Sequence, residues 1–408
     1  MKEPKIRFNE FKGEWKTPFI DEVFELRNGY TPSKAIDAFW KGGTIPWFRM
    51  EDIRENGGIL KDAIQHVTPL GIKGNGLFEK NSIILSTTAT IGVHAMLIAD
   101  SLANQRFTNF SIRKSLKNSY DPMFVYYSFF GIDEWSKKNT NSGGLLSVNI
   151  PFLLKQPFFT PSLAEQHSIA SFFTTLDAQI SASTSRLASL KQIKAASLQA
   201  MFPQEGETVP KLRFKGFEGE WETSPLNQYA KKRIEKNIKK LYDVTLTNSA
   251  EYGIIDQRFY FDHDISNAEN ISGYYVVREY DFVYNPRIST TAPVGPINQN
   301  KLGYIGVMSP LYLVFEVSGI DRNFLEIYFH TSLWHKYMLD NGNTGARFDR
   351  LAISDEVFMK MPIPKIDIAE QRAIASFFTN LDRQITLQSQ RLEKLKQIKA
   401  ACLDKMFV

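Results

Sequence analysis

The sequence predicts an α+β fold: two mixed α/β domains joined by two long helices that form an intrachain antiparallel coiled coil with pseudo-two-fold symmetry. Three observations predict it. Two segments of the 408-residue chain occur twice, the longer one has the composition of a helix, and the two intervening inserts alternate apolar runs with turn residues. We expect a first domain at 1–160, a first long helix at 161–203, a second domain at 204–363 and a second long helix at 364–408.

The repeats define a duplicated frame. Residues 4–15 recur as residues 210–221 with eight of twelve positions identical, at an offset of 206. Residues 163–202 recur as residues 368–407 with 25 of 40 positions identical, at an offset of 205. The inserts at 16–162 and 222–367 are nearly equal in length but show no comparable identity. A repeated frame that carries two different inserts predicts one task performed on two different targets.

The longer repeat is predicted to be a helix of the coiled-coil type. It contains no proline or glycine, and its apolar residues follow the 4-3 spacing of a coiled coil. Ser183 and Gln388 occupy the same polar seam position in the two copies. About 37 residues would span roughly 55 Å, or roughly 16 base pairs of duplex. The predicted seam residues are Ile169, Phe173, Leu176, Ile180, Leu187 and Leu190 in the first copy, and Ile374, Phe378, Leu381, Ile385, Leu392 and Leu395 in the second.

Packing of each helix on its own domain alone is the alternative to pairing. An exposed seam would be costly to leave open, so pairing within the chain is favoured.

Each insert is predicted to be a mixed α/β domain. Short apolar runs indicate strands, and a longer run near the end of each insert indicates a helix. In the first insert we expect strands at 45–49, 82–85, 92–98 and 107–112 and a helix at 123–138. In the second we expect strands at 273–278, 282–284, 302–307 and 311–317 and a helix at 323–339.

Several turn segments of the inserts carry residue types that read DNA. Arginine pairs with guanine, and asparagine or glutamine with adenine. A solvated side chain is the alternative for each residue taken singly, so the prediction depends on the set. In the first insert the set is Arg27, Asn28, Tyr30, Lys34, Arg49, Gln105, Arg106, Asn141 and Ser142. In the second it is Lys231, Lys232, Arg233, Arg287, Ser289, Thr290, Asn343 and Arg347.

Positive charge is concentrated in one short run. The net charge of +5 is mild for a nucleic-acid-binding protein, but residues 231–240 hold six basic residues and one acid. A solvated helix face is the usual explanation of such a run. Contact with phosphates becomes the better one where other features also indicate nucleic acid.

The composition favours a cytoplasmic protein without a membrane segment. Cys402 is the single cysteine, which excludes an internal disulfide. The first residues lack the apolar core of a signal peptide. Residues 82–99 carry no charged side chain, but their hydroxyl groups make them too polar to span a membrane. Two strands of a buried sheet are the better interpretation.

No catalytic constellation is evident. The chain has neither a phosphate-binding P-loop nor a nucleophile elbow, and Cys402 stands where the other copy has Ser197. Asp262-His263-Asp264 lacks a further ligand nearby, so a polar loop is favoured over a metal site. Residues 285–288 lack most of the methyltransferase signature that they faintly resemble. The chain is therefore expected to bind rather than to catalyse, and to carry no cofactor or metal.

The repeated motifs resemble the type I restriction–modification specificity subunits. The resemblance rests on the Ala-Glu-Gln … Met-Phe helices at 164–202 and 369–407 and on the Pro-Lys-x-Arg-Phe lead-ins. Residues 43–53 and Asn104-Gln105-Arg106 also look like that family's target-recognition domains. The second insert departs from the pattern, because Met308-Ser309-Pro310 stands where Asn-Gln-Arg would be expected.

The resemblance implies a non-catalytic subunit that recognises double-stranded DNA. Each insert would read one half of a split, asymmetric site, and the paired helices would act as a ruler and dock two modification (methyltransferase) subunits. Restriction subunits would join to translocate and cut DNA. S-adenosylmethionine, ATP and magnesium would belong to those partners, and the target adenine would flip into a partner's pocket. Two alternatives remain: a coiled-coil adaptor with two ligand-binding lobes, and a nucleic-acid enzyme with an unrecognised motif.

Overall fold

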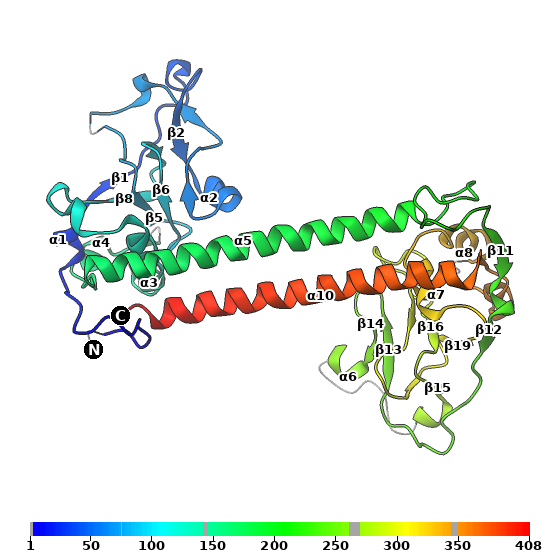
Figure 1. Cartoon of the computed structure of the whole chain (residues 1–408). Coiled ribbons are helices and arrows are strands. Elements are labelled where there is room, and N and C mark those ends of the chain that lie inside the picture. Colours follow the sequence, from blue (N-terminus) through cyan, green and yellow to red (C-terminus); the bar gives the residue numbers. More distant parts are fainter. Residues whose placement is uncertain (1–2, 75, 142–145, 261–269, 344–348) are drawn as a thin grey trace. The chain divides into compact units, whose positions relative to one another are not determined.

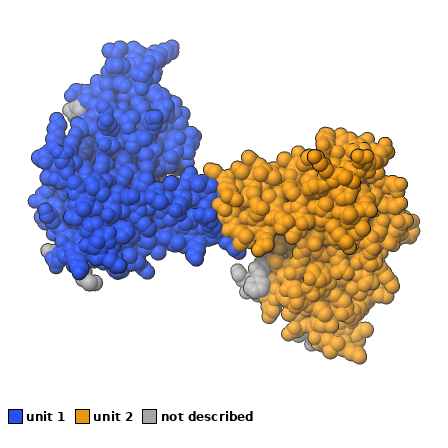
Figure 2. Space-filling model, viewed as in Figure 1, with its two compact units in different colours: residues 1–184, 390–408 blue, residues 185–389 orange. Residues whose placement is uncertain are grey.

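The computed structural model describes residues 3–74, 76–141, 146–260, 270–343 and 349–408. The chain forms two compact units (Figure 2). Unit 1 comprises Met1–Thr184 and Gln390–Val408, and unit 2 comprises Ser185–Ser389. Each unit therefore contains one insert and part of both long helices. The predicted α+β class, with two mixed domains and two long helices, is confirmed (Figure 1).

The long helices are α5 (Leu163–Ala200) and α10 (Ile368–Lys405), each 38 residues long. Every predicted seam residue is buried or half-buried, and so are Ser183 and Gln388. Within unit 1, Lys399 Nζ of α10 lies 2.6 Å from Asp177 Oδ1 of α5. Within unit 2, Lys194 Nζ of α5 lies 2.6 Å from Asp382 Oδ1 of α10.

These two ion pairs establish the antiparallel pairing, because the later residue of α5 pairs with the earlier residue of α10. They are also the same pair made twice. Asp382 and Lys399 are the repeat counterparts of Asp177 and Lys194 at the offset of 205, so each helix contributes the acid in one unit and the base in the other.

Unit 1 is built around a five-stranded sheet of order β1-β8-β5-β6-β3, with a three-stranded sheet β4-β2-β7 beside it and a small β9-β10 hairpin. Its strands are β1 (Phe24–Asn28), β2 (Ile45–Phe48), β3 (Ile59–Leu60), β4 (His66–Val67), β5 (Ser82–Ser86), β6 (His94–Leu97), β7 (Leu102–Ala103), β8 (Phe107–Ile112), β9 (Thr140–Asn141) and β10 (Ser147–Val148). Its other helices are α1 (Ile20–Val23), α2 (Met50–Asn56), α3 (Pro122–Lys138) and α4 (Ile150–Leu154).

Unit 2 contains an antiparallel sheet of order β12-β19-β16-β17 and three two-stranded sheets, β11-β20, β13-β14 and β15-β18. Its strands are β11 (Glu222–Pro225), β12 (Ala230–Lys232), β13 (Leu246–Ser249), β14 (Gly253–Asp256), β15 (Tyr275–Val277), β16 (Phe282–Tyr284), β17 (Ile297–Gln299), β18 (Gly306–Met308), β19 (Leu313–Val317) and β20 (Pro362–Lys365). Its other helices are α6 (Gln257–Tyr260), α7 (Arg322–Phe329), α8 (His335–Asn341) and α9 (Asp355–Met359).

The central sheets of the two units have the same topology despite their different sequences. Strands β1-β8-β5-β6 and β12-β19-β16-β17 follow the same order with antiparallel neighbours throughout. Both sheets begin nine residues after the lead-in tryptophan, Trp15 or Trp221. The two inserts are therefore divergent copies of one domain.

The start of each long helix clamps its domain. Glu165 is almost completely buried and accepts two hydrogen bonds from the Arg7 guanidinium, both 2.8 Å long. Glu370 accepts the same two bonds from Arg213, at 2.7 and 2.9 Å. The neighbouring Gln166 and Gln371 each accept a hydrogen bond from the backbone N–H of an aspartate that caps α3 or α7. The repeated Glu-Gln dipeptide thus fixes both the lead-in segment and the domain helix.

Each long helix begins in one unit and ends in the other, where the residues after its last turn complete the hydrophobic core. Phe407, after α10, packs on Phe124 of unit 1 with ring centroids 5.8 Å apart, and Phe124 packs on Trp15. Phe202, after α5, packs on Phe324 of unit 2 at the same 5.8 Å. Because every domain is closed by the start of one helix and the end of the other, the repeated Met-Phe motif has a packing role.

The structure corrects two details of the sequence prediction. The expected helix at 323–339 is two helices, α7 and α8, because Thr331 Oγ1 and Trp334 Nε1 donate to the carbonyls of Tyr328 and Phe329 and end the first helix there. The basic run at 231–240 is not a helix: its first two residues belong to β12 and the rest form a loop. Among the described residues, no helix is both long and apolar enough to cross a membrane.

We expect Glu370→Gln to lower the free energy of unfolding by about 2 kcal/mol, because Arg213 loses charge-assisted hydrogen bonds in a half-buried setting. Urea unfolding of the full chain measures this. The control is Glu356→Gln, which removes an exposed ion pair with Lys360 and should change stability by less than about 0.5 kcal/mol. Equal stabilities for the two variants would contradict the clamp.

Candidate nucleic-acid interface

In unit 1 the fold brings together two of the predicted DNA-reading loops. The backbone N–H groups of Gly29 and Tyr30 donate to the carbonyls of Phe107 and Ala103, both at 2.8 Å. A Cβ atom on Gly29 would lie 2.1 Å from the carbonyl oxygen of Asn104. Only glycine permits this approach. Asn28 and Tyr30 therefore lie beside the Asn104-Gln105-Arg106 turn, 75 residues away in sequence.

The Asn104-Gln105-Arg106 turn is held rigidly while its last two side chains face solvent. Asn104 Oδ1 accepts a hydrogen bond from the Arg106 backbone N–H at 3.0 Å, and Asn104 N donates to Phe48 O of β2 at 3.0 Å. Thr31 Oγ1 contacts Gln105 Oε1. Gln105 and Arg106 are exposed, so a fixed turn presents an amide and a guanidinium outward.

Two further cationic side chains lie against an aromatic cluster beside this turn. The buried Trp47 donates from Nε1 to the Tyr30 carbonyl at 2.9 Å and packs edge-on against Trp40. The side-chain cations of Lys34 and Arg49 lie 6.0 and 5.9 Å from the Trp47 ring centroid. In Figure 1, β2, which carries Trp47, lies in a lobe of unit 1 away from α5. Tyr30, Lys34 and Arg49 thus belong to one surface with the 104–106 turn.

Two other predicted residues of unit 1 lie differently. Arg27, near the end of β1, is half-buried and donates to the Leu77 carbonyl with its guanidinium 5.1 Å from the Phe78 ring, so it supports the fold. Asn141 is exposed on β9; the partner strand β10 is bound to Thr87, whose N–H donates to the Arg106 carbonyl. Asn141 therefore borders the same surface. Ser142 lies outside the described residues.

In unit 2 two of the predicted residues, Arg287 and Ser289, line a cleft of about 630 Å³. Its walls carry the side-chain types used for reading bases and contacting phosphates, and two tyrosines form part of the lining. The lining residues that matter here are Gln257, Asn285, Arg287, Ser289, Tyr312 and Arg350. Arg287 is exposed and pairs with Asp349 at 3.7 Å. Glu251 lines both this cleft and a neighbouring one of about 660 Å³, but the neighbouring cleft also contains Glu326, which suits a polyanion less well.

A close backbone contact shapes this cleft as well. Gly295 has φ +84°, and a Cβ there would lie 2.0 Å from the Asn285 carbonyl oxygen. The loop between them turns at Ser289, whose N–H and Oγ both bond to Ala292, and leaves Thr290 exposed. Asn343 is exposed and pairs through its backbone with Ala352, two residues beyond Arg350. Arg347 and residues 261–269, which include Asp262-His263-Asp264, lie outside the described residues.

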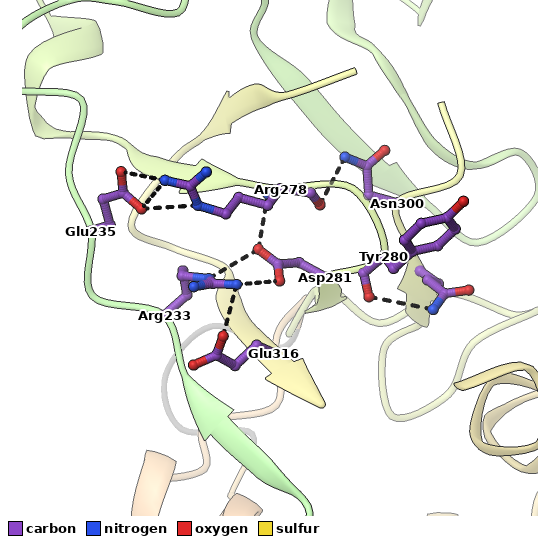
Figure 3. A network of polar contacts seen from close by, with 8 residues as sticks. Arg233, Glu235, Arg278, Tyr280, Asp281, Asn300 and Glu316 are labelled. Atoms are coloured by element: carbon purple, nitrogen blue, oxygen red, sulfur yellow. Dashed lines mark hydrogen bonds and ion pairs between the residues drawn. The ribbon is translucent and has the colours of Figure 1, made fainter. Parts of the chain in front are cut away.

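The basic run divides into bound and exposed residues. Lys231 is exposed, whereas Lys232 Nζ pairs with Asp355. Arg233 binds Asp281 at 2.8 Å and Glu316 at 3.0 Å, and its side chain is 19% exposed (Figure 3). The hydrogen bond to Asp281 raises the pKa of Arg233, while burial raises the pKa of Asp281. Arg233 therefore holds the fold together rather than extending into solvent.

Sequence reasoning missed several residues of these surfaces. Trp40, Tyr312 and Arg350 were not among the candidates. It also missed that Arg27 and Arg233 are counterparts, although each lies twelve residues after a lead-in tryptophan. That constant spacing could have indicated that both arginines have a structural role common to the two domains. Among the described residues, no group of three or more His, Cys, Asp or Glu side chains could hold a metal ion.

Comparison with known proteins identifies the domain type. Residues 12–192 match the family model described as type I restriction modification DNA specificity domain. The chain is 46% identical over 142 residues to the EcoprrI specificity subunit of Escherichia coli, covering 34% of this chain and 35% of that one. It is 28% identical over 177 residues to the MjaIX specificity subunit of Methanocaldococcus jannaschii, covering 40% and 38%. The matches thus span little more than a third of these relatives' lengths.

Two solved structures share the fold. The S subunit of a type I restriction–modification system from M. genitalium aligns over 100% of this chain and 99% of its own, with a TM-score of 0.56 and 14% identity. A chain from a study of complex assembly and conformational transition of the type I R-M system aligns over 96% and 97%, with a TM-score of 0.53 and 14% identity. At these identities the likeness concerns the fold alone.

We expect Gly29→Ala to destabilise unit 1 by about 3 kcal/mol, because the added Cβ must displace the Asn104 carbonyl and separate the two loops. Thermal unfolding measures the effect. Gly131→Ala is the matched control: Gly131 is an exposed residue inside α3 with no atom near its Cβ position, so alanine should stabilise by about 1 kcal/mol. A tolerated Gly29→Ala would show that the loops do not depend on this contact.

Proposed function

We propose that this chain is the DNA-recognition subunit of a type I restriction–modification complex and reads a bipartite, asymmetric site in double-stranded DNA. The premise is that the chain belongs to the family of type I restriction–modification specificity subunits. The observation that carries the proposal is a pair of domains with one topology and different reading surfaces. Two unlike surfaces on one frame suit two unlike half-sites.

The helices α5 and α10 are proposed to set the spacing between the half-sites. Each is an unbroken helix of 38 residues, about 57 Å at 1.5 Å per residue. Proteins with paired DNA-reading modules match half-site spacing to their own geometry. The exposed faces of the same helices are proposed to dock two methyltransferase subunits, and restriction subunits would join through these.

The chemistry is proposed to reside in the partners. S-adenosylmethionine, ATP and magnesium would bind to the methyltransferase and restriction subunits, and the flipped adenine would enter a methyltransferase pocket. This chain would contribute no catalytic step; its residues bind and orient the duplex. The complex is proposed to work in the cytoplasm, where its partners would modify chromosomal DNA.

Methylation mapping tests the proposal. The full chain is co-expressed with methyltransferase subunits of a type I restriction–modification system, and adenine methylation is mapped across the host genome. We expect one bipartite motif whose two specific halves are unrelated and separated by a fixed unread gap. A continuous palindrome, methylation without sequence dependence, or no association with a methyltransferase would overturn it in favour of an adaptor role.

Exchange of one insert tests modularity. Replacing residues 16–162 with the corresponding insert of another specificity subunit should change one half of the methylated motif, because the second reading surface remains intact. The reciprocal exchange of residues 222–367 is the matched control and should change only the other half. Simultaneous change of both halves in either chimaera would contradict independent reading.

A further inference from the structure

One loop of unit 2 presents large apolar side chains to solvent. Ile234, Ile238 and Leu241 are 75%, 76% and 72% exposed, the highest values among the large hydrophobic residues that the structure describes. Single exposed hydrophobic residues are ordinary on protein surfaces, but three within eight residues are not. We call residues 234–241 the apolar-basic loop, because Lys236, Lys239 and Lys240 alternate with these side chains.

The exposure of these side chains does not come from a loosely held loop. Asn237 is 2% exposed; its side chain donates to the Tyr242 carbonyl at 2.6 Å and accepts from the Tyr242 N–H at 3.2 Å. Its backbone N–H donates to the Tyr274 carbonyl at 3.0 Å. Lys240 adopts φ +51° and closes a turn onto the Asn237 carbonyl at 2.8 Å. The buried asparagine therefore fixes the direction of the exposed residues around it.

An ion-pair network anchors the beginning of the loop (Figure 3). Arg233 binds Asp281 and Glu316, and the Arg233 N–H donates to the Val314 carbonyl at 2.8 Å. Glu235 pairs with Arg278 at 2.9 Å, and its carbonyl accepts from Val276 N of β15. The one acid within the loop is thus already paired. Neither Lys236, Lys239 nor Lys240 forms a salt bridge with a described residue.

The loop occupies the same place in the domain as a predicted reading loop of unit 1. It begins one residue after β12 ends, as residues 29–34 follow β1, and β12 and β1 are equivalent edge strands of the shared sheet. It also borders the cleft of unit 2, because Tyr274, which binds Asn237, is a lining residue of that cleft. Both observations place it on the surface proposed to meet DNA.

We propose that the apolar-basic loop enters a groove of the duplex, where Ile234, Ile238 and Leu241 contact bases and the lysines contact phosphates. The inference rests on the proposed function and assigns a specificity role within it. Apolar side chains recognise thymine methyl groups or wedge between base steps, and lysine neutralises backbone phosphates. A rigid loop suits this task because its insertion requires no ordering on binding.

Two sets of substitutions in the full chain test the proposal. Lys236→Gln with Lys239→Gln should weaken binding to short duplexes of random sequence. The magnitude of the negative slope of log K against log salt should decrease by about 1.8, because two phosphate contacts at about 0.9 each are lost. Ile234→Ser, Ile238→Ser and Leu241→Ser together should leave that slope unchanged. In the co-expressed complex, the triple variant should lose base preference in one half of the methylated motif, with binding to that motif reduced roughly tenfold.

Matched controls remove equivalent groups elsewhere. Lys12→Gln with Lys215→Gln removes two exposed lysines of the lead-ins, and Val209→Ser with Leu212→Ser removes two exposed apolar side chains; both should bind DNA as the wild type does. A triple variant with an unchanged motif and affinity overturns the inference but not the proposed function. If instead the triple variant loses its methyltransferase partner, the loop is a protein-docking surface. Absence of any motif with the wild-type chain overturns both.

Discussion

The structure depends on one interaction made twice: the pairing of a buried glutamate at the start of a long helix with an arginine of the lead-in segment. Glu165 and Glu370 are 1% and 2% exposed, so each would be an uncompensated buried charge without Arg7 or Arg213. The neighbouring glutamine then positions the capped end of α3 or α7. The Glu-Gln dipeptide thereby holds the lead-in segment, the long helix and the domain helix together. Replacement of either the glutamate or the arginine alone would leave the other without its partner.

This constraint accounts for the distribution of identity along the chain. The repeated segments contain the residues that clamp and close each domain, from the Glu-Gln dipeptide to the terminal Met-Phe. The inserts need only preserve the sheet order and the burial of its apolar strands, which many sequences satisfy. The loops beyond the sheet carry even less packing constraint, because Gln105, Arg106 and Thr290 face solvent. Divergence is therefore permitted where target choice would be made.

Local sequence patterns predicted some features of the structure, whereas contacts between distant residues determined others. The long helices followed from a local period, and β5, β8 and β16 from compact apolar runs. Gly29 and Asn104 are in close contact although they lie 75 residues apart in the sequence, and no local sequence pattern predicts this contact. The position of Arg233 depends on Asp281 and Glu316, 48 and 83 residues further on. Long-range pairing, not propensity, decided the role of these residues.

The basic run illustrates the consequence for function. Of its six cations, Lys232 and Arg233 are bound by carboxylates, which leaves Lys231, Lys236, Lys239 and Lys240 for phosphates. The division follows side-chain chemistry: the planar fork of arginine matches two carboxylate oxygens and suits a fixed network, whereas lysine is a flexible point charge. A third of the six cations in the run are therefore bound within the fold, and three of the remaining four belong to the loop that also exposes its apolar side chains.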